Sequence, residues 1–275
     1  MNNQLKLCVA LLLVWGCGSN NTSLPNKYGS ISLESASEGI AAGSPKAFFY
    51  ENTSSGTGVC DVYVDDGTCR VWQCNDDAYT SLPAISVLDA GSLEVAGTNR
   101  ALPFSRGDDG SYEVVDFDGA ALWNGGETLT GTVGGSADIP AATLSILAPP
   151  ALNVTAPQIT SDGLTIEVAK DLPISWQQLE TADSIYVAIS TETDASQPDG
   201  TTIPNLAPAL DCKFAGNAGT GVVRSSLLSL MPKPAGLKAY HLDVLTFAYS
   251  QQRFNDSVLE LRATWLGLST TPTVQ

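Results

Sequence analysis

Carboxylates are the most plentiful groups in this chain that could do chemistry, whereas histidine is nearly absent. The sequence has 29 acidic residues and one histidine, His241. Histidine is the usual general base near neutral pH, and no Gly-x-Ser-x-Gly motif accompanies it, so a serine hydrolase is not predicted. Glycosidases instead need two carboxylates on either side of the substrate bond. We rank such a carboxylate-dependent hydrolase below a non-enzymatic role.

Acidic clusters in the first half of the chain are weak candidates for binding calcium, which takes about six to eight oxygen ligands. The candidate ligands are Asp65, Asp66, Asp76 and Asp77. Their spacing is not that of an EF-hand loop, and Asp-Gly and Asn-Asp are ordinary turn sequences. We therefore expect solvated turns without a metal or other cofactor, and calcium binding is the less favoured alternative.

Three aromatic residues are candidates for ligand binding: Trp72, Trp123 and Tyr79. Aromatic rings exposed on a β domain offer flat faces that can stack on sugar rings. A carbohydrate-binding protein is therefore the alternative to a binding, adhesion or structural module. Trp176 and Trp265 fall in the apolar phase of alternating segments, so we expect both in the core.

The start of the chain carries an export signal. Lys6 precedes about ten apolar residues, too few to span a bilayer, which needs about twenty, but typical of a cleaved signal peptide. The run ends in Gly16-Cys17, with Val14 three residues before the cysteine. This arrangement resembles the lipobox of bacterial lipoproteins.

The resemblance implies that residues 1–16 are removed and that Cys17 receives a diacylglycerol and becomes the mature N-terminus. Gly18 follows in place of aspartate, as in lipoproteins sorted to a Gram-negative outer membrane. We therefore expect a lipid-anchored protein of the cell outer membrane. The alternative is an ordinary secretory signal cut nearby, which would leave Cys17 as a plain thiol.

The charge of the chain limits its partners. The formal net charge is −16, and no run of Lys or Arg occurs, so nucleic acid would be repelled. Attachment to an anionic membrane then depends on the lipid on Cys17 rather than on basic residues. The partners that we expect are envelope polysaccharide or another envelope protein.

Four cysteines remain for disulfides in an oxidising compartment: Cys60, Cys69, Cys74 and Cys212. Four cysteines allow three connectivities. In a hairpin turning at residues 65–68, Cys60 lies close to Cys74 if a bulge shifts the register. Cys69 and Cys212 then either form a bridge or stay as buried thiols, and we favour the bridge.

Short alternating segments separated by Gly, Asp, Asn and Pro predict an all-β protein of two antiparallel β-sandwich domains. We assign residues 17–45 to the lipid anchor and a flexible tether, with one short helical turn near 33–41. The first sandwich is predicted over 46–148, with a half-buried strand at 128–133. Pro149-Pro150 suggests a boundary, and the second sandwich follows over 149–275.

The segment Leu172-Pro173-Ile174-Ser175-Trp176, followed by 185–189, resembles fibronectin type III and related immunoglobulin-like modules. The whole layout of lipobox, cysteine-bearing hairpin and immunoglobulin-like module is similar to bacterial surface lipoproteins. This resemblance implies a location and an architecture but no activity. The prediction is therefore a non-enzymatic, lipid-anchored envelope protein.

Overall fold

The computed structural model describes residues 27–38, 40, 42–53, 59–81, 84–159, 163–180, 183–197 and 201–275, and the predicted signal peptide and Cys17 lie outside these residues. The described chain is nearly all β, which confirms the predicted fold class. Its helices are the short α1 (Asp76–Thr80) and α2 (Ser225–Leu228), with a 3-10 turn, η1 (Gly216–Ala218). No helix in this described part is long and apolar enough to span a membrane.

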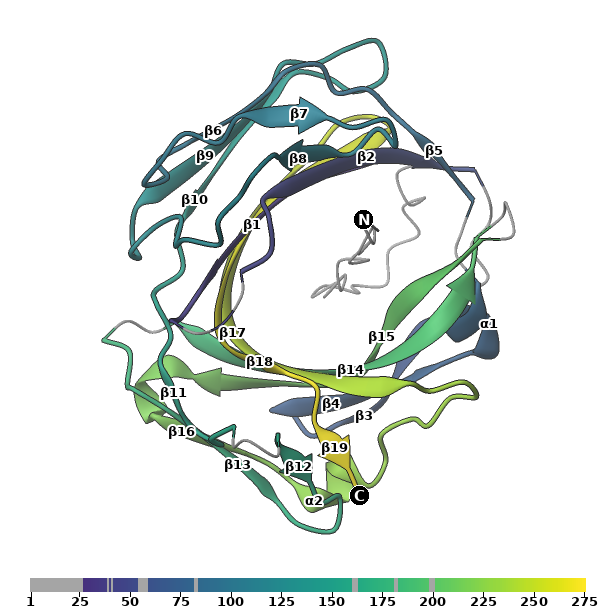
Figure 1. The fold of residues 1–275 in the computed structure, drawn as a ribbon, viewed down its shortest axis with the longest axis vertical. Coiled ribbons are helices and arrows are strands. Elements are labelled where there is room, and N and C mark those ends of the chain that lie inside the picture. Colours follow the sequence, from purple (N-terminus) through teal and green to yellow (C-terminus); the bar gives the residue numbers. More distant parts are fainter. Residues whose placement is uncertain are drawn as a thin grey trace.

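A large sheet of eleven strands organises the molecule. Its order is β3-β4-β15-β14-β17-β18-β1-β2-β8-β7, and β5 also pairs with β2. Figure 1 shows that this sheet is strongly curved, so that β2 and β15 lie toward opposite ends of its concave face. The strands are β1 (Lys27–Ala36), β2 (Lys46–Asn52), β3 (Cys60–Asp65), β4 (Cys69–Cys74), β5 (Ile85–Val87), β7 (Phe104–Arg106), β8 (Tyr112–Val114), β14 (Ser184–Ser196), β15 (Thr202–Ala215), β17 (Ala239–Arg253) and β18 (Ser257–Thr270).

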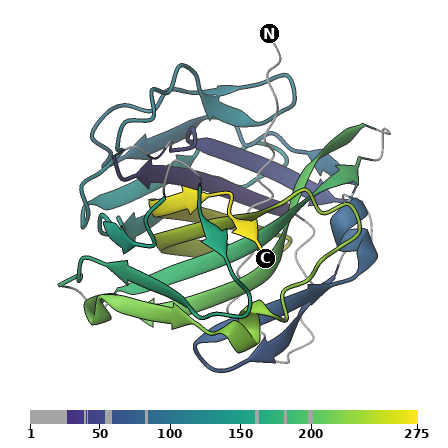
Figure 2. The same ribbon diagram turned by 60° about the horizontal axis from the view of Figure 1, so that its bottom comes forward.

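Smaller sheets cover the convex side of the large sheet (Figure 1 and Figure 2). Two of them have three strands each, in the orders β10-β9-β6 and β11-β13-β16, and β12 pairs with β19. The main hydrophobic core lies between these layers, as in a sandwich. Their strands are β6 (Leu93–Ala96), β9 (Thr128–Val133), β10 (Ala142–Leu147), β11 (Val154–Ala156), β12 (Thr165–Ile166), β13 (Leu172–Trp176), β16 (Thr220–Val223) and β19 (Thr273–Val274).

The alternation predicted at 128–133 is confirmed in β9, where Leu129 and Val133 are buried. Gly131 lies in the same phase. A Cβ atom at Gly131 would come within 3.1 Å of the Ile31 side chain and 3.2 Å of the Leu261 side chain. The glycine therefore lets β9 pack closely against the centre of the large sheet.

The tether predicted over 17–45 differs from the structure, because Lys27–Ala36 is strand β1 at the centre of the large sheet. β1 pairs in parallel with β18 and antiparallel with β2, so the expected helical turn is absent from Leu33–Ala36. Ile31 and Leu33 alternate with polar residues and are buried against the outer layer. Apolar and polar residues do alternate in this segment, but its many small polar residues led to the prediction of a tether.

The predicted division into two domains at Pro149 is not confirmed. Strands from both sides of Pro149 share the large sheet, and one core cluster contains residues from both. Each half nevertheless supplies one outer sheet, β10-β9-β6 from 46–148 and β11-β13-β16 from 149–275. Each half therefore has an outer layer of its own, while the shared sheet depends on pairings between distant segments.

Both predicted disulfides are confirmed, Cys60–Cys74 and Cys69–Cys212. A bulge between Val62 and Val64 brings Cys60 opposite Cys74, as the hairpin argument required. Cys69 lies opposite Cys212 where β4 pairs with β15. The second bond therefore joins neighbouring strands of the large sheet, far apart in sequence, rather than two separate domains.

Candidate functional site

The concave face of the large sheet gathers aromatic and charged side chains. Successive residues of a strand point to opposite faces, so the residues that alternate with buried Ile31 and Leu33 lie on this side. Strand registers extend the same face across β2, β18, β17 and β14. The face includes Tyr28, Ser30, Ser32 and Glu34 of β1, Phe48 and Tyr50 of β2, Tyr186 of β14, His241, Asp243, Phe247 and Tyr249 of β17, and Glu260 and Arg262 of β18.

Two groups of aromatic rings lie on this face. In the first group, the ring centroid of Tyr50 lies 5.6 Å from that of Tyr28 and 5.7 Å from that of Phe48. In the second group, the Phe247 centroid lies 4.5 Å from that of Tyr186 and 6.0 Å from that of Tyr249. Tyr249 is 50% exposed. The face therefore presents aromatic surface at two places across the sheet.

A polar strip on β1 and β18 separates the aromatic groups. The Tyr28 hydroxyl donates a hydrogen bond to Glu260 Oε2 at 2.6 Å, and Glu260 also forms an ion pair with Arg262. Burial raises the pKa of Tyr28 and of Tyr50, and the Arg262 guanidinium opposes both shifts. Both phenols are therefore protonated at neutral pH, since the ordinary phenol pKa is already about 10.

Two carboxyl groups of the same face, Glu34 and Asp243, are poorly solvated. Burial raises the pKa of Glu34, a hydrogen bond from the Gly43 amide opposes the shift, and Asp243 adds to it. Burial also raises the pKa of Asp243, against a hydrogen bond with Ser269 and the nearby His241. Each carboxyl therefore holds its proton to a higher pH than it would in water.

His241 is paired on this face. Its Nε2 atom lies 2.5 Å from Glu192 Oε2, and both side chains are partly buried. The register places His241 beside Ser190, also on the concave side. The single histidine of the chain is therefore held by a carboxyl group of the neighbouring strand.

The predicted aromatic platform of Trp72, Trp123 and Tyr79 is not formed. Trp123 is fully buried, its Nε1 donates to the Pro149 carbonyl at 3.0 Å, and its ring packs edge-on against buried Trp265. Tyr79 of α1 is also buried. Both rings serve the interior, because each lies where a neighbouring layer covers it.

Trp72 is partly exposed, as expected, but its polar edge is already engaged. Its Nε1 donates to buried Asp211, which also binds Arg70 at 2.8 Å. The Arg70 guanidinium lies 5.2 Å from the Trp72 ring centroid. Trp72 therefore packs in a local ion-pair cluster and lacks the two aromatic partners predicted for it.

Two of the candidate calcium ligands cap a turn, and the other two lie in the first turn of a helix. Asp65 accepts from the Gly67 amide at 2.7 Å, and Asp66 accepts from the amides of Thr68 and Cys69. The bond from Cys69 is the main reason that the pKa of Asp66 lies below its usual value. Asp76 and Asp77 occupy the first turn of α1, and no described residues form a cluster of three or more potential metal ligands. Turn hydrogen bonds account for Asp65 and Asp66.

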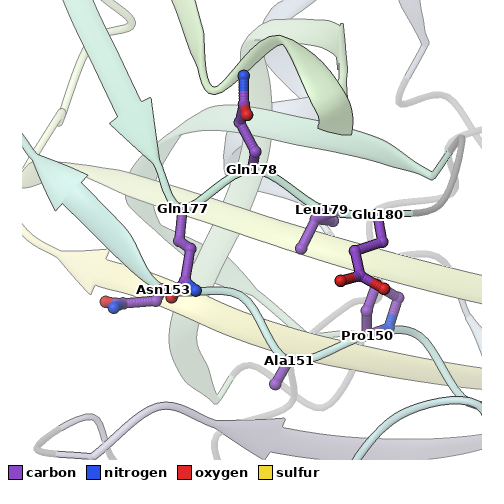
Figure 3. Close-up of a pocket in the computed structure, with 7 residues that line it drawn as sticks. All are labelled: Pro150, Ala151, Asn153, Gln177, Gln178, Leu179 and Glu180. Carbon is purple, nitrogen blue, oxygen red and sulfur yellow. The ribbon is translucent and has the colours of Figure 1, made fainter.

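A cavity of about 310 Å³ lies between two loops, away from the concave face. Pro150, Ala151 and Asn153 line one side, and the segment Gln177–Glu180 lines the other. Figure 3 shows the Gln178 side chain pointing away from the other lining side chains. The cavity lacks an aromatic ring and holds a single carboxylate, so it offers less recognition chemistry than the concave face.

The concave-face aromatics are not apparent from the sequence, because they come from separate segments that only the sheet brings together. Phe247 and Tyr249 occupy alternate positions of β17, and Tyr28 lies in the segment assigned to the tether. An available signal was the alternation of aromatic with aliphatic residues along a strand, as in Tyr186 between Ile185 and Val187.

Comparison with known proteins adds no relative: no family model matches the chain, and no curated protein matches it.

Proposed function

We propose that this chain is a non-enzymatic, lipid-anchored protein of the cell outer membrane that binds its ligand on the concave face of the large sheet. The observation that carries the proposal is the contrast between the two faces. Outer sheets cover the convex face, whereas no described helix or strand packs over the aromatic residues of the concave face. Aromatic side chains beside a few well-placed polar groups are typical of binding surfaces.

The location rests on the first 17 residues. An apolar run ending in Gly16-Cys17 supports cleavage before Cys17 and lipidation of its thiol. Acyl chains anchor strongly because each buried CH₂ contributes about 0.8 kcal/mol. Expression of Cys17→Ser with cell fractionation tests this part. We expect the variant to leave the membrane pellet, and retention there with unchanged mobility would contradict the anchor.

Binding on the concave face is tested with envelope fractions. The protein from residue 17 onward, carrying Cys17→Ser, is mixed with sacculi or outer-membrane vesicles of a Gram-negative bacterium, and its sedimentation is measured. We expect Tyr249→Ala to reduce co-sedimentation. Tyr63, which is 60% exposed on β3, provides the matched control as Tyr63→Ala. Equal effects of both variants would place binding elsewhere.

A carboxylate-dependent hydrolase is the second candidate, favoured by Glu34 and Asp243. Both carboxyls have raised pKa values, lie on the concave face and interact electrostatically. General acids in glycoside hydrolysis also need a raised pKa. Reducing-sugar release from polysaccharides that is abolished by Glu34→Gln or Asp243→Asn would support this candidate over a binding role.

A further inference from the structure

We propose that the ligand of the concave face is an uncharged polysaccharide chain that crosses the strands between the two aromatic groups. This inference rests on the proposed binding function and names its ligand class. The first group contains Tyr28, Phe48 and Tyr50, and the second contains Tyr186, Phe247 and Tyr249. Aromatic rings carry negative potential on their faces, which suits the C–H-bearing faces of sugar rings.

The polar strip between the aromatic groups supplies hydrogen bonds for hydroxyl groups. Register places Ser30 beside Glu260, and Ser32 beside Arg262. Tyr249 lies opposite Arg262 on the other side of β18. Glu260 itself is buried and paired with Tyr28 and Arg262. The Arg262 guanidinium and the hydroxyl groups of Ser30 and Ser32 therefore supply the donors and acceptors that a sugar hydroxyl requires.

The charges of the face favour a neutral ligand. Arg262 lies beside Glu260. The strand registers place two more ion pairs on this face, Lys46 with Glu113 next to Ser32, and Arg70 with Asp211 in line with Asp243. The whole chain carries a net charge of −16, so an acidic polymer would meet long-range repulsion. Paired charges attract neither sign strongly but still hydrogen-bond hydroxyl groups. An uncharged polysaccharide satisfies these conditions.

Other ligand classes match the face less well. An acyl chain would cover Arg262, Ser30 and Ser32 without hydrogen-bonding them, which is costly for polar groups. A peptide that binds by adding a strand needs a sheet edge, whereas β1, β17 and β18 lie in the interior of the sheet. A polysaccharide uses side chains alone and needs no edge.

Affinity electrophoresis of the mature chain with Cys17→Ser tests the inference. Native gels contain laminarin, hydroxyethylcellulose, galactomannan or dextran as neutral probes, and alginate as an acidic probe. We expect at least one neutral probe to retard the protein and alginate not to do so. Tyr249→Ala, Phe247→Ala and Tyr50→Ala should each weaken binding by about tenfold or more, equivalent to about 1.4 kcal/mol. Tyr63→Ala should bind as the parent does.

The outcomes separate this inference from the proposed function. If no neutral probe binds, or if alginate alone binds, the inference is overturned. If envelope fractions, phosphatidylglycerol vesicles or a displayed peptide library then bind with sensitivity to Tyr249→Ala, the concave face remains the binding site for another ligand class. If no binding depends on Tyr249, Phe247 or Tyr50, both proposals fail. Circular dichroism of each variant excludes misfolding as the cause.

Discussion

The two faces of the large sheet differ in chemistry although they belong to the same strands. On β1 and β18, Ile31, Leu33 and Leu261 point to the convex side and are buried beneath the outer sheets. Tyr28 and Arg262 point to the other side and meet aromatic or charged neighbours. Because side chains alternate along a strand, one sequence segment can serve the core with one set of residues and recognition with the other.

The largest loss of stability should come from removing a disulfide. The two disulfides also allow a comparison of the faces, because they lie on opposite sides of the sheet and close loops of different length. The buried Cys69–Cys212 bond spans 143 residues, and Cys60–Cys74 spans 14. In the chain-entropy model, replacing the two cysteines of Cys69–Cys212 by alanine should lower the free energy of unfolding by about 4–5 kcal/mol. The same replacement at Cys60–Cys74 should lower it by about 3 kcal/mol. Urea unfolding followed by tryptophan fluorescence measures both, and equal losses would contradict the ordering.

The second prediction compares neighbouring residues of β1 that face opposite sides. Ile31→Ala removes a buried side chain beneath β9 and should cost about 2–5 kcal/mol. Ser32→Ala acts on the concave side and should change the free energy of unfolding by less than about 0.5 kcal/mol. Thermal and urea unfolding of both variants checks this, and a large loss for Ser32→Ala would show that the concave face also carries stability.

The third prediction uses the pH dependence of Glu34. Its pKa is raised in the folded state, mainly by burial, so the folded chain binds its proton more tightly than the unfolded chain does. The resulting contribution is full below the unfolded pKa of about 4.3 and is lost as pH rises through the folded pKa. Glu34→Gln should therefore stabilise the protein at pH 7, and the difference should shrink toward pH 4.

Glu34→Gln keeps an oxygen that can accept the hydrogen bond from Gly43. Exposed Glu94 of β6 supplies the control Glu94→Gln, which should show little pH-dependent difference. Unfolding free energies are measured from pH 4 to pH 8 in steps. A stabilisation by Glu34→Gln that is independent of pH would indicate a cause other than the carboxyl charge.

A small effect on stability is also expected at Tyr249, which is 50% exposed. Tyr249→Ala should change the free energy of unfolding by about 0.5 kcal/mol or less, because its ring contacts mainly Phe247 on the same surface. Differential scanning calorimetry measures the stability of the variant. A loss of stability as large as that of Ile31→Ala would contradict the predicted contrast between the two faces. A small change in stability with a large loss of binding would instead sharpen that contrast.

Local sequence patterns were sufficient for the features that depend on neighbouring residues. Alternation predicted the β class and strand β9, and Asp-Gly at 66–67 predicted the hairpin whose bulge pairs Cys60 with Cys74. Turn propensity also placed Asp66 in a turn, where it accepts hydrogen bonds from the amides of Thr68 and Cys69. Each of these depends on interactions within a few residues, and such interactions are readable along the chain.

Tertiary structure alone decided which strands share a sheet and which side of each strand faces outward. β1 pairs with β18 across more than two hundred residues of sequence, and this pairing turned a predicted tether into a central strand. The burial of Trp123 and the grouping of Tyr186 with Phe247 follow from contacts between layers or strands. Alternation specifies two faces but not which one another sheet will cover, so the candidate site emerged only when the strands were assembled.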